Sequence, residues 1–229
     1  MTFSRWNAQG NIYLVAEGER LSPHAVRRAV GDADGILEVF AHGDDWLEIG
    51  IWNPDGSRAE MSGNGTRIAA SWLAALTGAS EVTVRVGARD VVARMLGDGL
   101  VEQDLGEVAV SPPAEADGIR FVAVDVGNPH AVVEGDPADL PRIGPLLETH
   151  ERFPHRTNVQ VARRTGGSEV EARVWERGAG ETASSGSSAV AVAAALAISP
   201  AVIHFPGGDL HVRLENGRAF LTGPAVRVD

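Results

Sequence analysis

The sequence predicts an α+β fold built from two pseudo-symmetric halves, each a strand-rich sheet wrapped around a central apolar helix. Three observations predict it. First, an alternating stretch, a polar Gly-rich loop, a Ser-Gly pair and a small-residue helix occur twice in that order. Second, both repeated helices are apolar on nearly every side, so each must be surrounded by protein. Third, most other segments alternate between apolar and polar residues, as short strands do.

The repeat is defined by its spacing. Trp52 and Trp175 each stand ten positions before a Ser-Gly pair, which begins at Ser62 in one copy and at Ser185 in the other. A strand-like alternation ends at each Trp. The shared spacing and flanks argue against a chance match, so we expect equivalent elements in the two halves. The repeat predicts strands over residues 46–52 and 170–175 and helices over residues 68–76 and 189–198.

The remaining elements follow from local patterns. A further helix is predicted over Pro23–Val30, because Ser22 is a favoured N-cap and Pro23 suits the first helical position. The linker is expected near Ser111–Ala114, where prolines cluster between strands. The halves are therefore expected at 1–113 and 114–229, with the last strand free to pack back on the first half. Alternation predicts strands over residues 82–86, 90–95, 100–105, 121–126, 158–162, 202–205, 210–214 and 219–221.

The composition excludes several classes of function. The chain has 229 residues and a net charge of −11, which suits neither a nucleic-acid partner nor an anionic membrane surface. It has no cysteine, so disulfides, thiolate nucleophiles and Cys-zinc sites are excluded. All 20 basic residues are arginines, which excludes the Schiff-base lysine of pyridoxal phosphate (PLP) enzymes and the lysine of a Walker loop. The expected ligand is a small molecule.

Cofactor and targeting signals are also missing from the sequence. His150 and His155 lack the spacing of a helical zinc pair, and Pro154 interrupts any helix between them. The glycines at 178 and 180 do not fit a dinucleotide fingerprint, because a Ser-containing loop follows them. We therefore expect no metal and no cofactor. Met1–Gly10 has no apolar signal-peptide stretch, and no run of about 18 apolar residues occurs, so we expect a cytoplasmic protein.

The two Ser-Gly pairs are candidate binding and catalytic positions. A helix N-terminus offers unpaired N–H donors and partial positive charge, which suit a carboxylate. Two such ends would hold one carboxylate from both sides and place Ser62 and Ser185 on opposite faces of the bound molecule. The alternative is that both serines are only N-caps, since Ser is a favoured cap residue.

Other polar residues suit an amino-acid ligand. Glu176 offers a carboxylate for an ammonium group, and Arg177 offers a guanidinium for a carboxylate. The alternative for this pair is a surface ion pair of little energetic value. Asn53 and Asn128 stand beside prolines, where asparagine is most often a turn residue.

At these residues the chain resembles the diaminopimelate epimerase family, whose fold is shared with proline racemases and phenazine-type isomerases. The resemblance covers nearly the whole chain. It implies a two-domain, PLP-independent racemase or epimerase of lysine biosynthesis, which closes around an amino acid and can form a homodimer. The matching motifs are, in order, Trp6–Asn11, Asn53–Ser57, Ser62–Arg67, Gly127–His130, Glu151–Pro154 with Asn158, Glu176–Thr182, Pro206–Gly208 and Thr222–Val226.

The resemblance also implies the site. In the family, a cysteine from each half flanks the substrate α-carbon, and one removes a proton while the other donates one to the opposite face. The matching positions are Ser62 and Ser185, which are the implied catalytic residues. The implied substrate-binding residues are Asn11, Asn53, Gly63, Asn64, Asn128, Asn158, Glu176, Arg177, Gly186 and Ser187.

Serine at both positions changes the chemistry. A free thiol has a pKa of about 8.5, whereas an alcohol ionises far less readily and needs an activating neighbour. The candidates for such support are His130 and Glu181. The chain also has Gly35 where the family often has Gln, and Ile68 where many members have Cys.

Three hypotheses follow for the function. The first is an isomerase of the diaminopimelate epimerase type, with two-base proton transfer at the α-carbon of an amino acid. The second is a divergent isomerase or dehydratase that acts on a more acidic carbon. The third is a non-catalytic protein that binds an amino acid or small carboxylate. Exchange of the α-proton with deuterated water distinguishes the first from the third.

Overall fold

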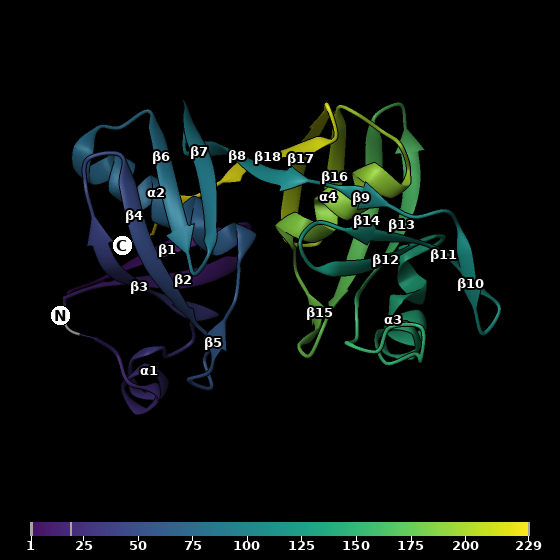
Figure 1. The fold of residues 1–229 in the computed structure, drawn as a ribbon, viewed down its shortest axis with the longest axis horizontal. Coiled ribbons are helices and arrows are strands. Elements are labelled where there is room, and N and C mark those ends of the chain that lie inside the picture. The colour runs from purple at the N-terminus through teal and green to yellow at the C-terminus, as the bar shows by residue number, and fades with distance from the viewer. Residues whose placement is uncertain (1, 19, 229) are drawn as a thin grey trace. The chain divides into compact units, whose positions relative to one another are not determined.

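The computed structural model describes residues 2–18 and 20–228, which form two compact units. Unit 1 comprises Met1–Asp104 and Thr222–Asp229, and unit 2 comprises Leu105–Leu221. The chain passes from one unit to the other within two strands, β8 (Leu100–Glu107) and β18 (Arg218–Pro224). Each unit is rich in strands and has few helices (Figure 1), which confirms the predicted α+β class.

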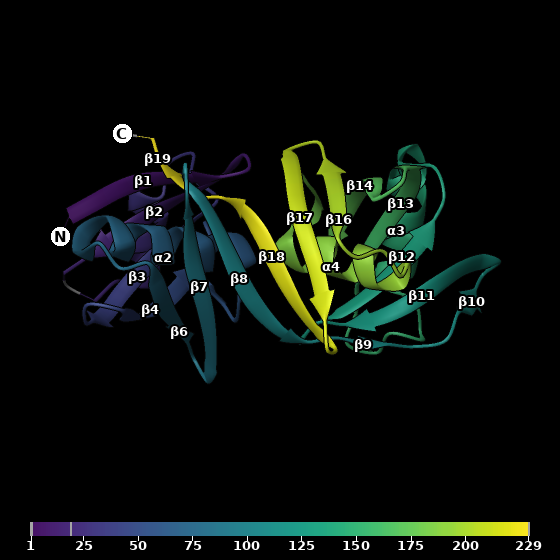
Figure 2. The same ribbon diagram turned by 90° about the horizontal axis from the view of Figure 1, so that it is seen from above.

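Unit 1 encloses helix α2 (Gly63–Thr77). Ile68, Ala69 and Leu73 of α2 have no exposed surface, because they pack on apolar side chains of the surrounding strands. Figures 1 and 2 show α2 among these strands. Besides its part of β8, the strands of unit 1 are β1 (Thr2–Ala8), β2 (Asn11–Glu17), β3 (Gly35–His42), β4 (Trp46–Trp52), β5 (Arg58–Ala59), β6 (Glu81–Val86), β7 (Arg89–Gly97) and β19 (Val226–Arg227), which pairs antiparallel with β1.

Unit 2 encloses helix α4 (Gly186–Ala195) in the same way. Ala189–Ala193 are fully buried and belong to the main apolar cluster of this unit. Figure 2 shows α4 beside β16 and β17. Besides its part of β18, the strands of unit 2 are β9 (Ala109–Val110), β10 (Ala114–Ala116), β11 (Ile119–Asp125), β12 (Pro129–Glu134), β13 (Asn158–Gly166), β14 (Glu169–Glu176), β15 (Gly180–Thr182), β16 (Ala201–Phe205) and β17 (Gly208–Glu215).

The strand pairing repeats between the units. In unit 1, β1–β2, β3–β4 and β6–β7 are antiparallel, and β2–β3 and β4–β6 are parallel. In unit 2, β11–β12, β13–β14 and β16–β17 are antiparallel, and β12–β13 and β14–β16 are parallel. Each parallel pair is joined through a helix, as parallel pairing requires a crossover connection. The repeat detected around the two tryptophans is therefore a repeat of the whole unit.

Each unit also has an outer helix in the first of its two crossovers. Helix α1 (Pro23–Ala29) joins β2 to β3, and its N-cap is Ser22, whose hydroxyl accepts from the Ala25 N–H as predicted. Helix α3 (Leu140–Glu148) follows the 3₁₀ turn η1 (Pro137–Asp139) and joins β12 to β13. The sequence pattern does not predict α3, because Pro145 lies inside the helix and obscures its periodicity.

The boundaries of the central helices differ from those predicted. Helix α2 begins at Gly63, one turn before the predicted start, because the Gly-rich loop already has helical geometry. Helix α4 ends at Ala195, and Ala197 has a φ of 53°, in the left-handed region that ends helices. Both serines of the repeat are N-cap residues. None of the helices in the described ranges is long and apolar enough to cross a membrane.

Candidate active site

Ser62 lies at the N-terminus of α2 and caps it. Its backbone is extended, and its Oγ accepts from the Gly65 N–H at 3.0 Å. The Oγ also lies 3.2 Å from the hydroxyl of Tyr13, which donates to it from β2. Ser62 is therefore an N-cap, and its second hydrogen bond goes beyond what a cap requires.

Asn64 connects the start of α2 to β2. Its Nδ2 donates to Oδ1 of Asn11 at 3.3 Å, and its Oδ1 accepts from the guanidinium of Arg67 at 2.5 Å. Arg67 is fully buried, which lowers its pKa to about 10, and its Nε has no hydrogen-bond partner among the described residues. The first half of the predicted site thus has a buried positive charge beside Gly63, whose carbonyl accepts from Arg67 at 3.5 Å.

Asn53 has a turn role in the structure. Its Nδ2 donates to Oγ of Ser57 at 2.9 Å, and its carbonyl accepts from the N–H of Gly56 at 3.0 Å. Asp55 completes this turn by accepting from the Ser57 hydroxyl, and that hydrogen bond holds the pKa of the Asp55 carboxyl below its usual range. The structure shows no hydrogen bond from Asn53 to Asn11, Ser62 or Asn64.

Ser185 lies at the N-terminus of α4 but has a different environment. It is 7% exposed, and its side chain makes no cap hydrogen bond. Gly186 and Ser187 begin the helix behind it, and Ser188 is buried and accepts from Nε2 of Gln160 at 2.9 Å. The two predicted catalytic serines are therefore equivalent in position and unequal in their partners.

Buried His130 contacts part-buried Asn128 near the start of β12. Nε2 of His130 lies 3.0 Å from Oδ1 of Asn128, and Nδ1 lies 3.0 Å from Nε2 of Gln160. Burial lowers the pKa of His130 to about 3, and the positive charge of Arg177 acts in the same direction. A neutral imidazole then donates through Nε2 to Asn128 and accepts at Nδ1. His130 therefore orients the Asn128 amide.

Asn158 supports the turn that carries Glu176 and Arg177. Its Nδ2 donates to the Pro129 carbonyl at 2.9 Å, and its Oδ1 accepts from the Arg177 N–H at 3.0 Å. The hydroxyl of Thr182 donates to Glu176 at 2.6 Å, but burial outweighs this hydrogen bond and raises the pKa of the Glu176 carboxyl. The arrangement brings Asn158, Glu176 and Arg177 together in unit 2, with the Arg177 side chain exposed.

Glu148 is a functional candidate that the sequence did not reveal. This last residue of α3 accepts from Nε1 of Trp175 at 2.7 Å and from the Gly178 N–H at 2.8 Å. Burial acts to raise its pKa, but these two hydrogen bonds and nearby Arg156 lower the pKa of the Glu148 carboxyl overall. Glu148 thus holds the turn after Arg177, and no sequence pattern connects it to that turn.

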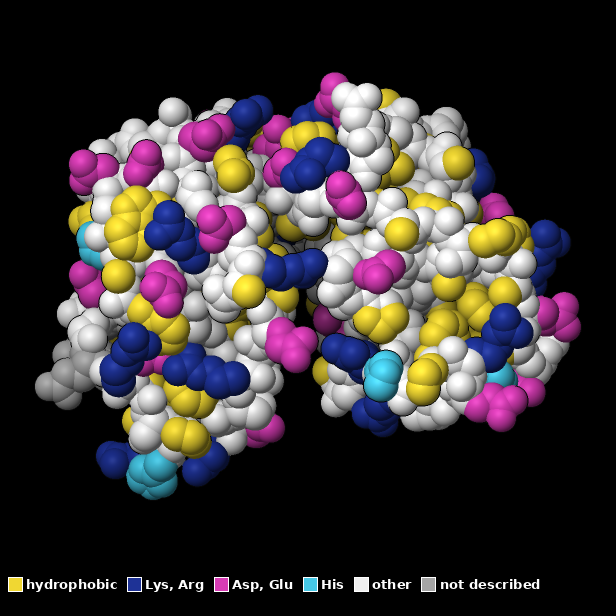
Figure 3. Space-filling model, viewed as in Figure 1, with side chains coloured by type: hydrophobic (Ala, Val, Ile, Leu, Met, Phe, Trp, Pro, Cys, Tyr) yellow, Lys and Arg dark blue, Asp and Glu magenta, His cyan; other side chains and the backbone are white. Residues whose placement is uncertain are grey.

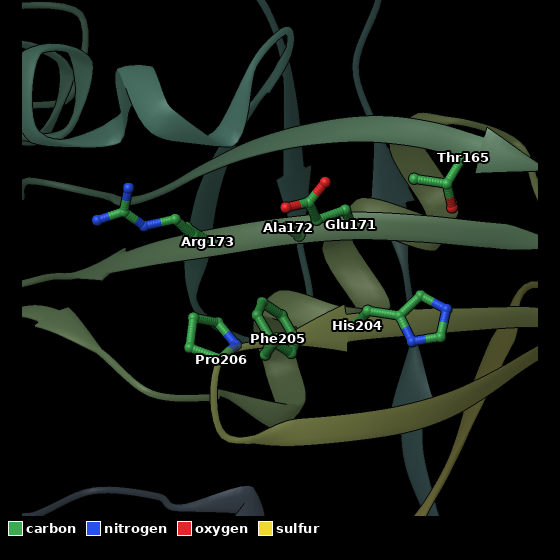
Figure 4. Close-up of a pocket in the computed structure, with 7 residues that line it drawn as sticks. All are labelled: Thr165, Glu171, Ala172, Arg173, His204, Phe205 and Pro206. Carbon is green, nitrogen blue, oxygen red and sulfur yellow. The ribbon is translucent and has the colours of Figure 1, made fainter.

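The sequence predicts that Glu181 supports a catalytic serine, but the side chain that Glu181 contacts in the structure is Arg173. Its carboxylate pairs in two hydrogen bonds with Arg173, at 2.7 and 2.8 Å. Arg173 also lines a shallow pocket of about 420 Å³ on unit 2, which Figure 4 shows with Glu171 and His204 spread over neighbouring strands. Glu171 pairs with Arg163, and His204 lies 2.7 Å from Asp209. The charged groups of this pocket therefore have protein partners already.

The described residues contain no group of three or more His, Cys, Asp or Glu side chains that could hold a metal ion. Figure 3 shows acidic and basic side chains interspersed over the visible face, without one large field of either sign. The chemistry available at the candidate site is thus that of hydroxyls, amides, the carboxylates of Glu148 and Glu176, and guanidinium groups.

Comparison with known proteins decides the family. A family model described as diaminopimelate epimerase matches residues 122–228. A diaminopimelate epimerase from a Synechocystis species is 31% identical over 271 aligned residues, which cover 100% of this chain and 97% of the relative. The chain belongs to the diaminopimelate epimerase family. A second relative of this name, from a Synechococcus species, is 34% identical over 277 residues, with 100% of this chain and 96% of the relative covered.

Solved structures share the fold at lower identity. A predicted epimerase from Pseudomonas aeruginosa has a TM-score of 0.80 at 17% identity, and 99% of this chain and 96% of that chain are covered. A hydroxyproline epimerase from Agrobacterium vitis, solved with bound trans-4-hydroxy-L-proline, has a TM-score of 0.69 at 15% identity, with 99% and 88% covered. The diaminopimelate epimerase family fold thus extends over the described chain, as the sequence resemblance predicted.

Proposed function

We propose that this protein is a cofactor-independent amino-acid epimerase of the diaminopimelate epimerase type, with Ser62 and Ser185 as the two proton carriers. The observation that carries the proposal is the equivalence of these serines. Each is the N-cap residue of the buried helix in its unit, within the same repeated strand order, in a chain that belongs to this family. A helix N-terminus stabilises negative charge on an adjacent oxygen, which is what a proton carrier needs.

The polar groups of the two units support an amino-acid substrate. Glu176 offers a part-buried carboxylate to an ammonium group, and the exposed guanidinium of Arg177 offers two parallel hydrogen bonds to a carboxylate. The relatives' name points to diaminopimelate, an amino acid with two such ends, and to lysine biosynthesis. The other proposed substrate-binding residues are Asn11, Asn53, Gly63, Asn64, Asn128, Asn158, Gly186 and Ser187. A homodimer also stays a prediction.

The test is exchange of the α-proton in deuterated water. Purified protein is incubated with a panel of amino acids that includes the LL and meso forms of diaminopimelate, and deuterium at the α-carbon is measured by NMR. We expect incorporation and interconversion of the two diaminopimelate forms. Binding of a panel member without any exchange would refute the epimerase proposal and support a non-catalytic binding protein.

Serine variants assign the proton carriers. Ser62→Ala and Ser185→Ala are each expected to reduce exchange by about 100-fold or more, the range for general acid–base groups. Ser71→Ala is the matched control, because Ser71 is also buried in α2 but lies far along the helix from its N-terminus. Full exchange in Ser62→Ala would contradict the assignment. A double Ser62→Cys and Ser185→Cys variant is expected to exchange faster than wild type, since a thiol ionises more readily.

A further inference from the structure

Tyr13 is the only tyrosine of the chain, and it is hydrogen-bonded to a proposed proton carrier. It lies in β2, it is 7% exposed, and it belongs to the apolar cluster around α2. From this buried position its hydroxyl donates to Oγ of Ser62 at 3.2 Å. The apolar packing of the ring does not require that contact, so the hydroxyl calls for an explanation of its own.

The hydrogen bonds of Ser62 define what its hydroxyl can do. A serine oxygen has two acceptor lone pairs, and here one accepts from the Gly65 N–H and the other from Tyr13. Over residues 2–18 and 20–228, no hydrogen bond takes up the proton of the Ser62 hydroxyl. The neutral hydroxyl is therefore set to donate a proton, and two donors already face the oxygen on which negative charge would develop.

Gly35 makes the position of the Tyr13 ring possible. Tyr13 and Gly35 are directly paired in the parallel β2–β3 ladder. A Cβ at Gly35 would lie 2.6 Å from Cε1 of Tyr13 and 2.5 Å from the Trp52 carbonyl oxygen. Gly35 is not among the glycines with positive φ, so close approach and not backbone conformation favours glycine there. The Tyr13 ring thus occupies the space that a side chain at position 35 would fill.

We propose that Tyr13 is the proton partner of Ser62, so that the two hydroxyls act as one acid–base unit in the proton transfer proposed above. When the pair donates, the Ser62 O–H bond breaks and its proton forms a C–H bond with the electron pair of the α-carbanion. The Tyr13 proton moves to Ser62 Oγ, and the negative charge ends on the phenolate. When the pair accepts, the same bonds form and break in reverse, and water resets the pair between turnovers.

The Tyr13–Ser62 pair removes the main chemical difficulty of serine as a proton carrier. An aliphatic alcohol is a poor acid, whereas a phenol ordinarily has a pKa of about 10. The relay leaves the charge on the phenol and avoids a free alkoxide. Tyr13 acts through Ser62, so it is a positioning and relay residue and does not itself touch the substrate. In the part of the chain that the structure describes, the side chain of Ser185 makes no cap hydrogen bond.

The first test does not need activity. Because Tyr13 is the only tyrosine, tyrosinate absorbance during a pH titration reports on this residue alone. An ionised phenolate is stabilised by a hydrogen bond from Ser62 more strongly than the neutral phenol is by the existing one. Ser62→Ala is therefore expected to raise the titration midpoint by about one pH unit. The matched control is Ser22→Ala, which removes the equivalent cap of α1. An unchanged midpoint in Ser62→Ala overturns the proposal.

The second test is a double-mutant cycle on exchange. Tyr13→Phe is expected to lower the exchange kcat by about 100-fold with little change in KM, and thermal melting checks that the variant folds. In a Ser62→Cys background the same change should matter less than about 5-fold, since a thiolate needs no phenol to carry its charge. An equal loss in both backgrounds, or a loss confined to KM, overturns the proposal.

Glycine variants test the geometry. Gly35→Ala is expected to displace the ring and to reproduce the kcat loss of Tyr13→Phe, whereas Gly166→Ala, a strand glycine with open space around it, should have no effect. Full kcat in Gly35→Ala contradicts the role of the ring position. The proposal rests on the epimerase function, but the two can fail separately. Absence of exchange in wild type refutes the function, while the titration still decides whether the hydroxyls are coupled.

Discussion

Replacing Glu148 by Gln tests how the Glu176–Arg177 turn is held. In the wild type the Glu148 carboxylate accepts from Nε1 of Trp175 at 2.7 Å and from the Gly178 N–H at 2.8 Å. A glutamine keeps one acceptor oxygen but presents an NH₂ group to one of the two donors. That donor then faces another donor at a part-buried position, where water only partly replaces the lost acceptor.

The magnitude follows from these contacts. A hydrogen bond to a charged group contributes about 1.5–3 kcal/mol, and a buried donor without an acceptor loses about 1–3 kcal/mol. Arg156 lies 3.5 Å from Glu148 but its side chain is 53% exposed, so that ion pair adds little. We expect Glu148→Gln to lower the free energy of unfolding by about 2–3 kcal/mol at pH 7. The loss should depend on pH, because the folded pKa of Glu148 is lowered.

The direction of the pH dependence follows from the lowered pKa of Glu148 in the folded state. A lowered folded pKa contributes stability that is present above the unfolded value and is lost as pH falls through the folded value. The wild-type advantage over Glu148→Gln should therefore be full at pH 7 and should shrink below the ordinary value of 4.5. Urea unfolding at pH 7 and below pH 4.5, followed by tryptophan fluorescence, measures this difference in the free energy of unfolding between wild type and Glu148→Gln.

Glu171→Gln is the matched control for Glu148→Gln. Glu171 is about half exposed and pairs with Arg163 at 2.7 Å, so its loss should lower the free energy of unfolding by less than about 1 kcal/mol. If Glu148→Gln is no more destabilising than this control, the reasoning about the buried carboxylate is wrong.

The remaining predictions concern packing and buried charge. Gly144→Ala should lower the free energy of unfolding by about 1–3 kcal/mol, because its Cβ would lie 2.8–2.9 Å from Trp175, while Gly166→Ala should be neutral in the same urea assay. ¹⁵N NMR should find His130 neutral down to about pH 4. The stability that its lowered pKa contributes should be full above pH 6.5 and should be lost as the pH falls toward about 3. Arg67→Met should lower the free energy of unfolding by about 1–3 kcal/mol, because the buried Oδ1 of Asn64 loses its donor; an unchanged free energy of unfolding contradicts this.

The sequence revealed the repeat because its signals are local. A tryptophan at the end of an alternating stretch and a Ser-Gly pair at a fixed sequence distance can be recognised without knowledge of the tertiary contacts. Ser22 before Pro23 also specifies a helix start by itself, and the structure has the predicted cap. The α+β class followed from the same patterns, since a helix without a polar side must be surrounded by protein and most other segments alternate as strands do.

The features that the sequence did not predict depend on long-range contacts. The buried residues Leu140, Ile143 and Leu147 of helix α3 have helical spacing. Gly144 and Pro145 interrupt this pattern, because neither residue favours a helix interior. Gly144 is there because the Trp175 ring packs against it, which only the folded chain shows. The partner of Ser62 could not be predicted either, since Tyr13 is far from it in sequence. Family resemblance named the positions, but it did not indicate the hydrogen bonds of the residues present in this chain.

The two units repeat their support but not the environment of their serines. Nε1 of Trp52 donates to buried Glu38 at 2.8 Å, as Nε1 of Trp175 donates to Glu148 at 2.7 Å. Each indole thus anchors the strand end that precedes a site loop, which explains physically why tryptophan stands at both repeat positions. Ser62 has two donors on its oxygen whereas Ser185 has no cap hydrogen bond, so the hydroxyls of the two proposed proton carriers should differ in acidity. If the proposed reaction occurs, proton removal from the two diaminopimelate forms should therefore proceed at different rates, because each form presents its proton to a different serine. Equal rates of deuterium incorporation from both forms would count against unequal carriers.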